Sequence, residues 1–170
     1  MSVPEEHKRR APSKLKYSVF IVSTSRYAGM VNEDITGQLA SEMIEKSGNV
    51  IVRKEVIPDD IGIIRRSLLK ASEDSDVILF CGGTGVSKSD VTPEALRPLL
   101  TKEIPGFGEI FRWLSYSQVG SAAIASRASA GVYLDSLVFL LPGSPDAVKL
   151  ALEKIVIPEA PHMIAVIRSL

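Results

Sequence analysis

The sequence predicts an α/β fold built on a mostly parallel sheet. Short apolar runs rich in β-branched and aromatic residues alternate with segments of roughly 10 to 15 residues that show helical spacing. This alternation implies right-handed crossovers between neighbouring parallel strands. Two later apolar runs are separated by only two residues, which predicts a hairpin and so one antiparallel strand. The 170 residues, 45% of them hydrophobic and 24% charged, suffice for one domain with its own core.

The first half of the chain carries the strongest strand and helix patterns. Apolar runs predict strands at Tyr17–Ser23, Val50–Val56 and Asp76–Cys81. The second of these alternates apolar and charged residues, so one of its faces should be wetter. Helical spacing in the two intervening segments predicts helices carrying Ile35, Leu39, Met43 and Ile44, then Ile61, Ile64, Leu68 and Leu69.

The second half is less regular. Thr92 followed by Pro93 predicts a helix start, with Thr92 as the N-cap. The segment 104–112 shows no clear periodicity. The predicted hairpin pairs Ala130–Leu134 with Leu137–Leu141. Ser144 then caps a last helix, which runs through Val148, Leu152 and Ile155, and we expect Pro158 and Pro161 to interrupt the tail before a final helical turn or two.

Composition excludes several classes of protein. Lys plus Arg and Asp plus Glu are both 20, so no global field favours nucleic acid, and we expect no nucleic-acid partner. The single cysteine, Cys81, allows neither an intrachain disulfide nor a cysteine metal site, which fits a reducing compartment. No run approaches the ~18 apolar residues of a membrane span, and the charged start is unlike a secretion signal. We therefore expect a cytoplasmic protein without a membrane partner.

The start of the chain differs from the rest. Residues 1–15 are basic and contain almost nothing apolar. They predict a flexible arm, either a plain solvated tail or a binding arm. The folded domain is expected to be 16–170.

Three loops at the carboxyl ends of predicted strands are rich in small or hydroxyl residues: 23–32, 82–92 and 142–145. In an open parallel sheet, ligands bind at this edge. The Gly82-Gly83-Thr84-Gly85 loop is the most informative, because glycines let backbone N–H groups approach an anion. The helix start at Thr92 would add its positive partial charge. Together the loops predict a phosphate-binding site, although a glycine-rich loop alone can be a tight turn.

The common nucleotide motifs are absent. A P-loop requires a glycine before the lysine, but Ser87 precedes Lys88. The dinucleotide fingerprint requires a third glycine at the position that Lys88 occupies. His7 and His162 lie in the two tails, so neither a catalytic histidine nor a zinc site is expected. The sequence therefore supports neither a typical kinase nor a dehydrogenase.

Several polar residues could act at this site or serve only structure. Asp90 could hold Mg²⁺ beside bound phosphates, or it could cap a turn. Asp59 stands before a helix, where capping is the ordinary role. Arg127 could place its guanidinium near a phosphate, but a lone arginine is commonly a surface or ion-pair residue. Ser144 could present N–H groups to an anion or only cap its helix.

Four sequence blocks, taken together, resemble the MoaB/MogA family of molybdopterin-binding proteins. They are GGTGVSKSDVTPEA from Gly82, IPGFGEIFR from Ile104, SRASAG from Ser126 and LPGSP from Leu141. Their order and spacing match, and the resemblance covers about residues 16 to 165. It implies a three-layer α/β/α sandwich and a homo-oligomer, either a trimer or a hexamer. It also implies a place in molybdenum cofactor biosynthesis, with a downstream metal-inserting enzyme as partner.

The activity implied by the resemblance is Mg²⁺- and ATP-dependent adenylylation of molybdopterin. Asp90 matches the family's essential aspartate, with Mg²⁺ held through phosphates, and Asp59 matches a second functional acidic position. The remaining implied positions are Gly82, Gly83, Thr84, Gly85, Thr92, Ser126, Gly143 and Ser144 for nucleotide and pterin, with Ser23 and Ser25 as contacts from the first loop.

Two departures and two rival functions accompany this reading. Thr24 stands where the family often has aspartate, and Thr36 stands where serine is frequent. The main alternative is a non-catalytic protein that binds molybdopterin and hands it on, which would need neither Asp90 nor ATP. A third hypothesis is a nucleotide pyrophosphatase on the same scaffold. Trp113, Leu114 and Tyr116 follow Phe111 in a segment with more aromatic surface than one small core needs, which favours an oligomer. The alternative is that all four residues belong to the core.

Overall fold

The computed structural model describes residues 12–31 and 33–169. The strands are β1 (Lys16–Val22), β2 (Val50–Ile57), β3 (Val77–Cys81), β4 (Lys102–Glu103), β5 (Ser129–Tyr133) and β6 (Ser136–Leu141). The helices are α2 (Thr24–Tyr27), α3 (Ile35–Lys46), α4 (Ile61–Ala71), α5 (Thr92–Leu96), α6 (Pro105–Val119), α7 (Pro145–Ala151) and α8 (Ile157–Ile167). Short 3₁₀ segments lie at Arg97–Leu99 (η1) and Gly120–Ala125 (η2), and a π-helical segment lies at Leu152–Val156 (η3).

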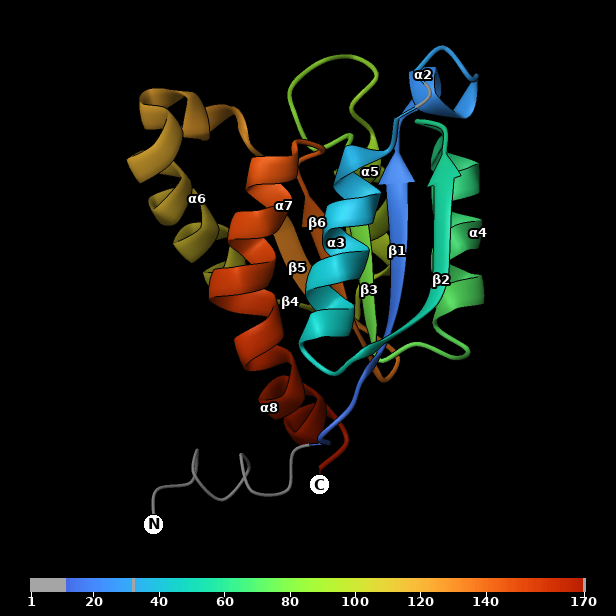
Figure 1. Ribbon diagram of the computed structural model, residues 1–170, viewed down its shortest axis with the longest axis vertical. Helices are drawn as coiled ribbons and strands as arrows, with labels where there is room; N and C mark the ends of the chain where they lie inside the picture. The colour runs from blue at the N-terminus through green and yellow to red at the C-terminus, as the bar shows by residue number, and fades with distance from the viewer. Residues whose placement is uncertain (1–11, 32, 170) are drawn as a thin grey trace.

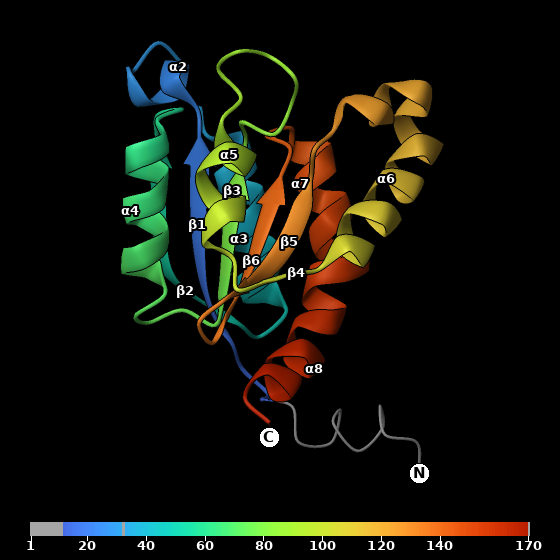
Figure 2. The same ribbon diagram turned by 180° about the vertical axis from the view of Figure 1, so that it is seen from behind.

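The described strands form one six-stranded sheet in the order β2-β1-β3-β6-β5-β4. The pairs β1–β2, β1–β3 and β3–β6 are parallel, whereas β5 runs antiparallel to both of its neighbours. The predicted mostly parallel sheet with one antiparallel strand is therefore confirmed, and so is the hairpin. Helices cover both faces, α3, α6, α7 and α8 on one and α4 and α5 on the other (Figures 1 and 2). The chain is a three-layer α/β/α sandwich.

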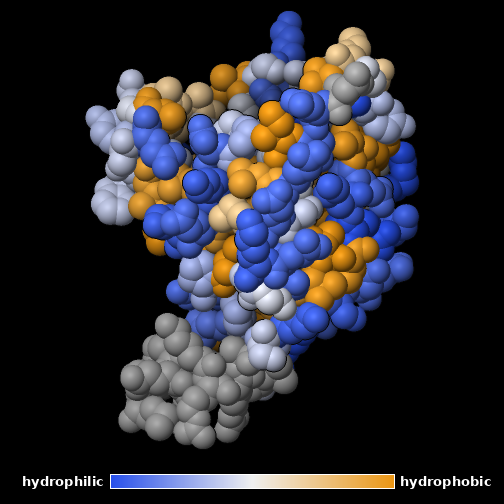
Figure 3. All heavy atoms as spheres, in the orientation of Figure 1, coloured by the Kyte–Doolittle hydropathy of each residue, from blue (hydrophilic) through white to orange (hydrophobic). Residues whose placement is uncertain are grey.

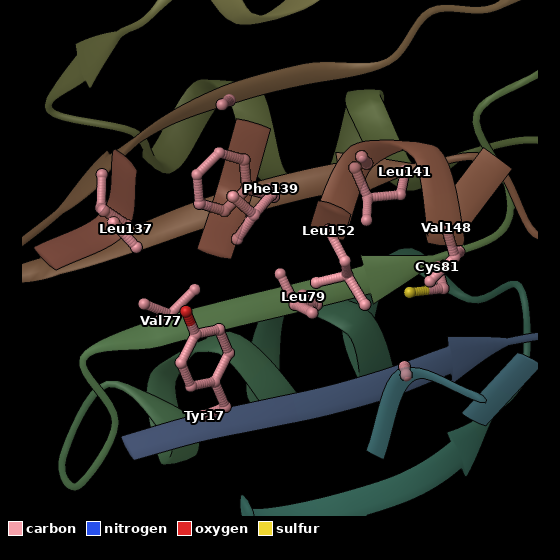
Figure 4. Close-up of a cluster of buried hydrophobic side chains, with 14 of the residues drawn as sticks. Tyr17, Val77, Leu79, Cys81, Leu137, Phe139, Leu141, Val148 and Leu152 are labelled. Atoms are coloured by element: carbon pink, nitrogen blue, oxygen red, sulfur yellow. The ribbon is translucent and has the colours of Figure 1, made fainter. Parts of the chain in front are cut away.

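Two cores explain the three layers, because neighbouring residues of each central strand point to opposite faces. In β3, Val77, Leu79 and Cys81 join the larger core, while Ile78 and Phe80 join the smaller one. Figure 4 shows the larger core, with side chains of β1, β3 and β6 meeting Val148 and Leu152 from the covering helices. On the other face, the rings of Phe20 and Phe80 stack at 4.9 Å. Burial on both faces makes these strands apolar throughout.

The structure corrects the expected end of the chain. Pro158 and Pro161 do not interrupt it, since α7, η3 and α8 follow one another without a break. Pro158 stands in the first turn of α8, directly after the π-helical segment. Proline lacks the N–H of an ordinary helical hydrogen bond, and the π turn just before Pro158 already shifts the hydrogen-bond register there.

Segment 104–112 is also more regular than its sequence indicates. It lies almost wholly within α6, a helix of 15 residues that starts at Pro105. Phe107 and Phe111, four residues apart, stack on each other at 5.9 Å and lie in the core. The exposed side of the same helix is also apolar, at Ile110 and Trp113. Apolar residues on both sides obscure the helical period.

The start of the chain can be followed only in part. Residues 1–11 of the predicted basic arm lie outside the described residues. Leu15 is buried, its N–H donates to Asn49 Oδ1 at 2.9 Å, and its carbonyl accepts from Val50 N at 3.0 Å. Leu15 is thus attached to the sheet just before β1. No helix among the described residues is long and apolar enough to span a membrane.

Candidate functional site

The candidate site lies at the carboxyl edge of the sheet, at the top of Figure 1. In the sheet, β2 lies on one side of β1 and β3 lies on the other side, so the strand order reverses between β1 and β3. Ligand sites in open α/β sheets form at such a reversal. The Gly82–Gly85 loop leaves β3 at this point, as predicted. We define this loop together with Val86–Val91 as the glycine loop.

Each glycine of the loop touches a different part of the fold. A Cβ on Gly82 would meet Val22 O at 2.2 Å, and a Cβ on Gly143 would meet Gly82 Cα at 3.3 Å. A Cβ on Gly83 would lie 2.4 Å from Thr92 Oγ1 and 3.2 Å from Asp59 Oδ1. Gly82 and Gly83 also have φ of +122° and +65°, which L side chains rarely adopt. The loop is therefore the point at which β1, β3, β6 and both aspartates approach one another.

All four carbonyls of Gly82–Gly85 are hydrogen-bonded inside the protein. Thr92 Oγ1 donates to Gly82 O at 2.8 Å, and Thr92 N donates to Gly83 O at 3.0 Å. Arg127 N donates to Thr84 O at 2.9 Å, and Arg127 Nε donates to Gly85 O at 2.7 Å. Thr92 and Arg127 thus hold the loop from the side of its carbonyl oxygens.

The backbone N–H groups of the loop are placed differently. In a trans peptide the N–H points opposite to the preceding C=O, and the described chain has no cis peptide. The N–H groups of Gly83–Val86 therefore point away from Thr92 and Arg127. Within the described part of the chain, none of these four N–H groups donates a hydrogen bond to the protein. Unpaired N–H groups in succession form a site suited to an anion.

Asp90 lies against the end of this loop. A Cβ on Gly85 would come within 2.8 Å of Asp90 Oδ2, which accepts a hydrogen bond from Ser87 N at 2.8 Å. Asp90 N in turn donates to Ser87 O at 3.1 Å. Asp90 therefore caps a turn, and its Oδ1 has no hydrogen-bond partner among the described residues. A hollow of about 410 Å³ opens here, lined by Val86–Lys88, Asp90, Val91, Glu94 and Arg127.

Asp59 lies on the other flank, beside Gly83. Thr24 donates to Asp59 Oδ2 from both its N and its Oγ1, at 2.8 Å each. Thr24 Oγ1 also accepts from Asp59 N at 3.0 Å. Asp59 does not cap α4, since that role belongs to Asp60, whose Oδ1 accepts from Ile63 N. Thr24 thus fixes one oxygen of the Asp59 carboxylate beside the glycine loop.

The serines of the first and third loops form hydrogen bonds within the protein. Ser23 caps α2, accepting from Arg26 N at 3.4 Å, and its hydroxyl lies 3.2 Å from that of Ser25. Ser144 caps α7, as predicted, accepting from Ala147 N at 3.3 Å. Buried Thr36 donates to Gly143 O at 2.9 Å, which ties this loop to α3.

One sequence-based assignment is wrong. Thr92 is not the N-cap of α5, because Val91 occupies that position and Thr92 is a buried residue of the helix that bonds the glycine loop. The assignment of Ser126 to nucleotide or pterin binding stays a prediction: its Oγ accepts from Ala128 N at 3.3 Å, and it lines a separate hollow of about 670 Å³ between α5 and α6. This larger hollow shares only Glu94 and Arg127 with the one at Asp90.

Comparison with known proteins decides the family. Residues 18–162 match the family described as a probable molybdopterin binding domain. The chain belongs to the MoaB/MogA family. It is 46% identical to the molybdenum cofactor biosynthesis protein B of Bacillus subtilis, over 99% of each chain.

Solved structures of the family share the fold. The tungsten cofactor synthesizing protein MoaB from Pyrococcus furiosus has a TM-score of 0.86 at 37% identity, covering 93% of this chain and 99% of that one. A solved MogA has a TM-score of 0.80 at 31% identity, covering 88% of this chain and 99% of that one. The family that the four sequence blocks indicated is therefore confirmed, as is its fold.

The tight packing of Gly82 leads to a stability prediction. We expect Gly82→Ala to lower the free energy of unfolding by about 2–4 kcal/mol, because the added Cβ would clash with Val22 O in a backbone conformation that alanine disfavours. Gly106→Ala is the matched control, since its Cβ would meet nothing within 4 Å, and should change stability by about 1 kcal/mol or less. Urea unfolding measures both; equal effects would mean that the Gly82 contact is not tight.

Proposed function

We propose that this chain acts in molybdenum or tungsten cofactor biosynthesis as a molybdopterin adenylyltransferase. The observation that carries this proposal is the row of unpaired N–H groups at Gly83–Val86, flanked by Asp59 and Asp90. In the proposed reaction, a terminal phosphate oxygen of molybdopterin attacks the α-phosphorus of ATP. A new P–O bond forms, the bond from the α-phosphorus to the oxygen bridging to the β-phosphorus breaks, and pyrophosphate leaves.

The chain's residues suit this chemistry because phosphoryl-type transfers depend on positioning and charge stabilisation. The N–H groups would bind phosphate oxygens and stabilise charge that develops on them in the transition state. No nucleophilic side chain is required, since the substrate phosphate attacks. Family membership supports the pterin as substrate, because relatives carry the names of cofactor biosynthesis proteins.

Asp90 is the residue proposed to hold Mg²⁺. Among the described residues, no group of three or more His, Cys, Asp or Glu could hold a metal by itself. Mg²⁺ commonly binds one or two carboxylates together with phosphate oxygens and water, and Asp90 Oδ1 fits that donor set. When bound, the ion would neutralise charge on the phosphates.

The alternative is a non-catalytic molybdopterin-binding protein. One oxygen of each aspartate is already bonded within the protein, Asp90 Oδ2 to Ser87 N and Asp59 Oδ2 to Thr24. A site that only binds the pterin phosphate would have the same arrangement. ATP dependence separates the two functions.

The test is pyrophosphate release from Mg²⁺–ATP and molybdopterin by the wild type and by Asp90→Asn. We expect the wild type to release pyrophosphate and the variant to lose about 100-fold or more in rate, because the amide cannot replace a charged metal ligand. Asp135→Asn, at an exposed hairpin turn away from the glycine loop, is the control and should match the wild type. Release at the wild-type rate by Asp90→Asn would contradict the metal role.

A wild type that binds molybdopterin but releases no pyrophosphate would instead support the non-catalytic function. Hydrolysis of ADP-ribose without pterin would support the pyrophosphatase.

We also propose that the chain forms a homo-oligomer, a trimer or hexamer, through α6. Four apolar residues of this helix are exposed, namely Ile110, Trp113, Tyr116 and Val119, and Trp113 and Tyr116 are 72% and 64% exposed. Figure 3 shows hydrophobic residues among polar ones over α6, at the left of the view. Several large exposed apolar side chains on one helix are typical of protein interfaces.

Trp113→Asp should therefore lower the mass of the particle in solution, measured by light scattering at micromolar concentration. A charge buried without a partner would oppose association by a few kcal/mol. Leu69→Asp, on α4 at the other face of the sheet, replaces a similarly exposed apolar residue and should leave the mass unchanged. A monomeric wild type would contradict the oligomer.

A further inference from the structure

Arg127 lies between η2 and β5 and donates three hydrogen bonds to the glycine loop. Its N donates to Thr84 O at 2.9 Å, its Nε to Gly85 O at 2.7 Å and its Nη2 to Asp90 O at 2.8 Å. These three partners lie 37 to 43 positions before Arg127 in the chain. One side chain therefore binds both ends of the segment that contains Asp90.

The remaining arm of the guanidinium pairs with α5. Arg127 Nη1 donates to Glu94 Oε1, and this bond is the main cause that holds the pKa of Glu94 below its ordinary value. Both side chains are partly exposed, at 35% and 49%, so the pair by itself adds little stability. Its effect is on orientation: Glu94 holds the planar fork so that Nε and Nη2 face the loop carbonyls.

These contacts determine where the N–H groups of the loop point. Because peptides are trans, a Gly85 carbonyl turned toward Arg127 directs the N–H of Val86 to the opposite side, and the Asp90 carbonyl does the same for the N–H of Val91. Neither N–H donates to any described residue. Among the described residues, only Arg127 donates a hydrogen bond to the Gly85 and Asp90 carbonyl oxygens.

We propose that Arg127 is a positioning residue, which acts on the substrates only through the backbone of the glycine loop and through the placement of Asp90. Nε, Nη1 and Nη2 of Arg127 already donate to the loop carbonyls and to Glu94. In this proposal the guanidinium therefore does not bind phosphate directly. The expected effect of Arg127 on turnover rests on the proposed function, but its effect on the order of the glycine loop can be measured without substrate.

The experiment compares Arg127→Gln and Arg127→Lys with Arg97→Gln. Arg97 is the control because it also pairs with a partly exposed glutamate, Glu103, at 3.1 Å, and forms no hydrogen bond with the glycine loop. Hydrogen exchange of peptides covering residues 84–91 is measured by mass spectrometry on the full chain without ligand. Circular dichroism and urea unfolding confirm that each variant is folded. The apparent affinity for Mg²⁺–ATP and the rate of pyrophosphate release are then determined on the same samples.

In Arg127→Gln we expect the bonded amides of this segment, those of Ser87, Ser89 and Asp90, to exchange about tenfold faster, with exchange of β3 and β6 unchanged, because only the local restraint is lost. Arg127→Lys should show a smaller increase, since an ammonium keeps the charge but cannot donate in a fork. Turnover should fall about tenfold or more with a smaller change in KM, since a misplaced Asp90 affects the transition state more than binding. Arg97→Gln should match the wild type throughout.

Unchanged exchange of residues 84–91 in Arg127→Gln would overturn the proposal, whatever the activity. Full rescue by Arg127→Lys in both exchange and turnover would also overturn it, because charge alone would then suffice. If the wild type shows no turnover, the adenylyltransferase function fails while the exchange comparison still decides whether Arg127 orders the loop.

Discussion

The candidate site depends on one constraint of the peptide bond: a carbonyl and the N–H that follows it point in opposite directions. Thr92 and Arg127 bind the four carbonyls of Gly82–Gly85, so the four N–H groups that follow are directed away from them. These donors have no partner among the described residues. The site is therefore formed by backbone, and side chains contribute chiefly by setting the direction of that backbone.

The sheet topology supplies the space for this arrangement. Strand order reverses between β1 and β3, and the glycine loop enters the resulting crevice with Gly82 pressed against Val22 O. Gly143 approaches the same residue from the end of β6. Because neither glycine carries a Cβ, the ends of β1, β3 and β6 can approach one another closely at this point. Asp59 and Asp90 then flank the loop, beside Gly83 and Gly85.

Local sequence patterns predicted the parts of the fold that depend on local physics. The buried strands were predictable because burial on both faces demands apolar residues throughout, as in β3. Helix α6 was not, because Ile110 and Trp113 are apolar on the exposed side, opposite Phe107 and Phe111. The unbroken passage through Pro158 depends on a π turn, for which the sequence carries no clear signal.

The same distinction applies to the site. The glycines, Asp90 and Ser144 could be chosen from local motifs, and the family resemblance added Asp59. The roles of Thr92, Thr24 and Arg127 could not be derived locally, because each depends on partners 10, 35 and 42 positions away. The SRASAG block pointed to Arg127 but not to its action, which is on carbonyl groups rather than on a phosphate.

The most direct test of the account is an NMR titration of ¹⁵N-labelled protein with inorganic pyrophosphate and with Mg²⁺–ATP. We predict that the amide signals of Gly83, Thr84, Gly85 and Val86 shift most, and that they saturate at the same ligand concentration. Amide shifts concentrated instead at the N-terminus of α6, beside the hollow of about 670 Å³, with Gly83–Val86 unchanged, would contradict it.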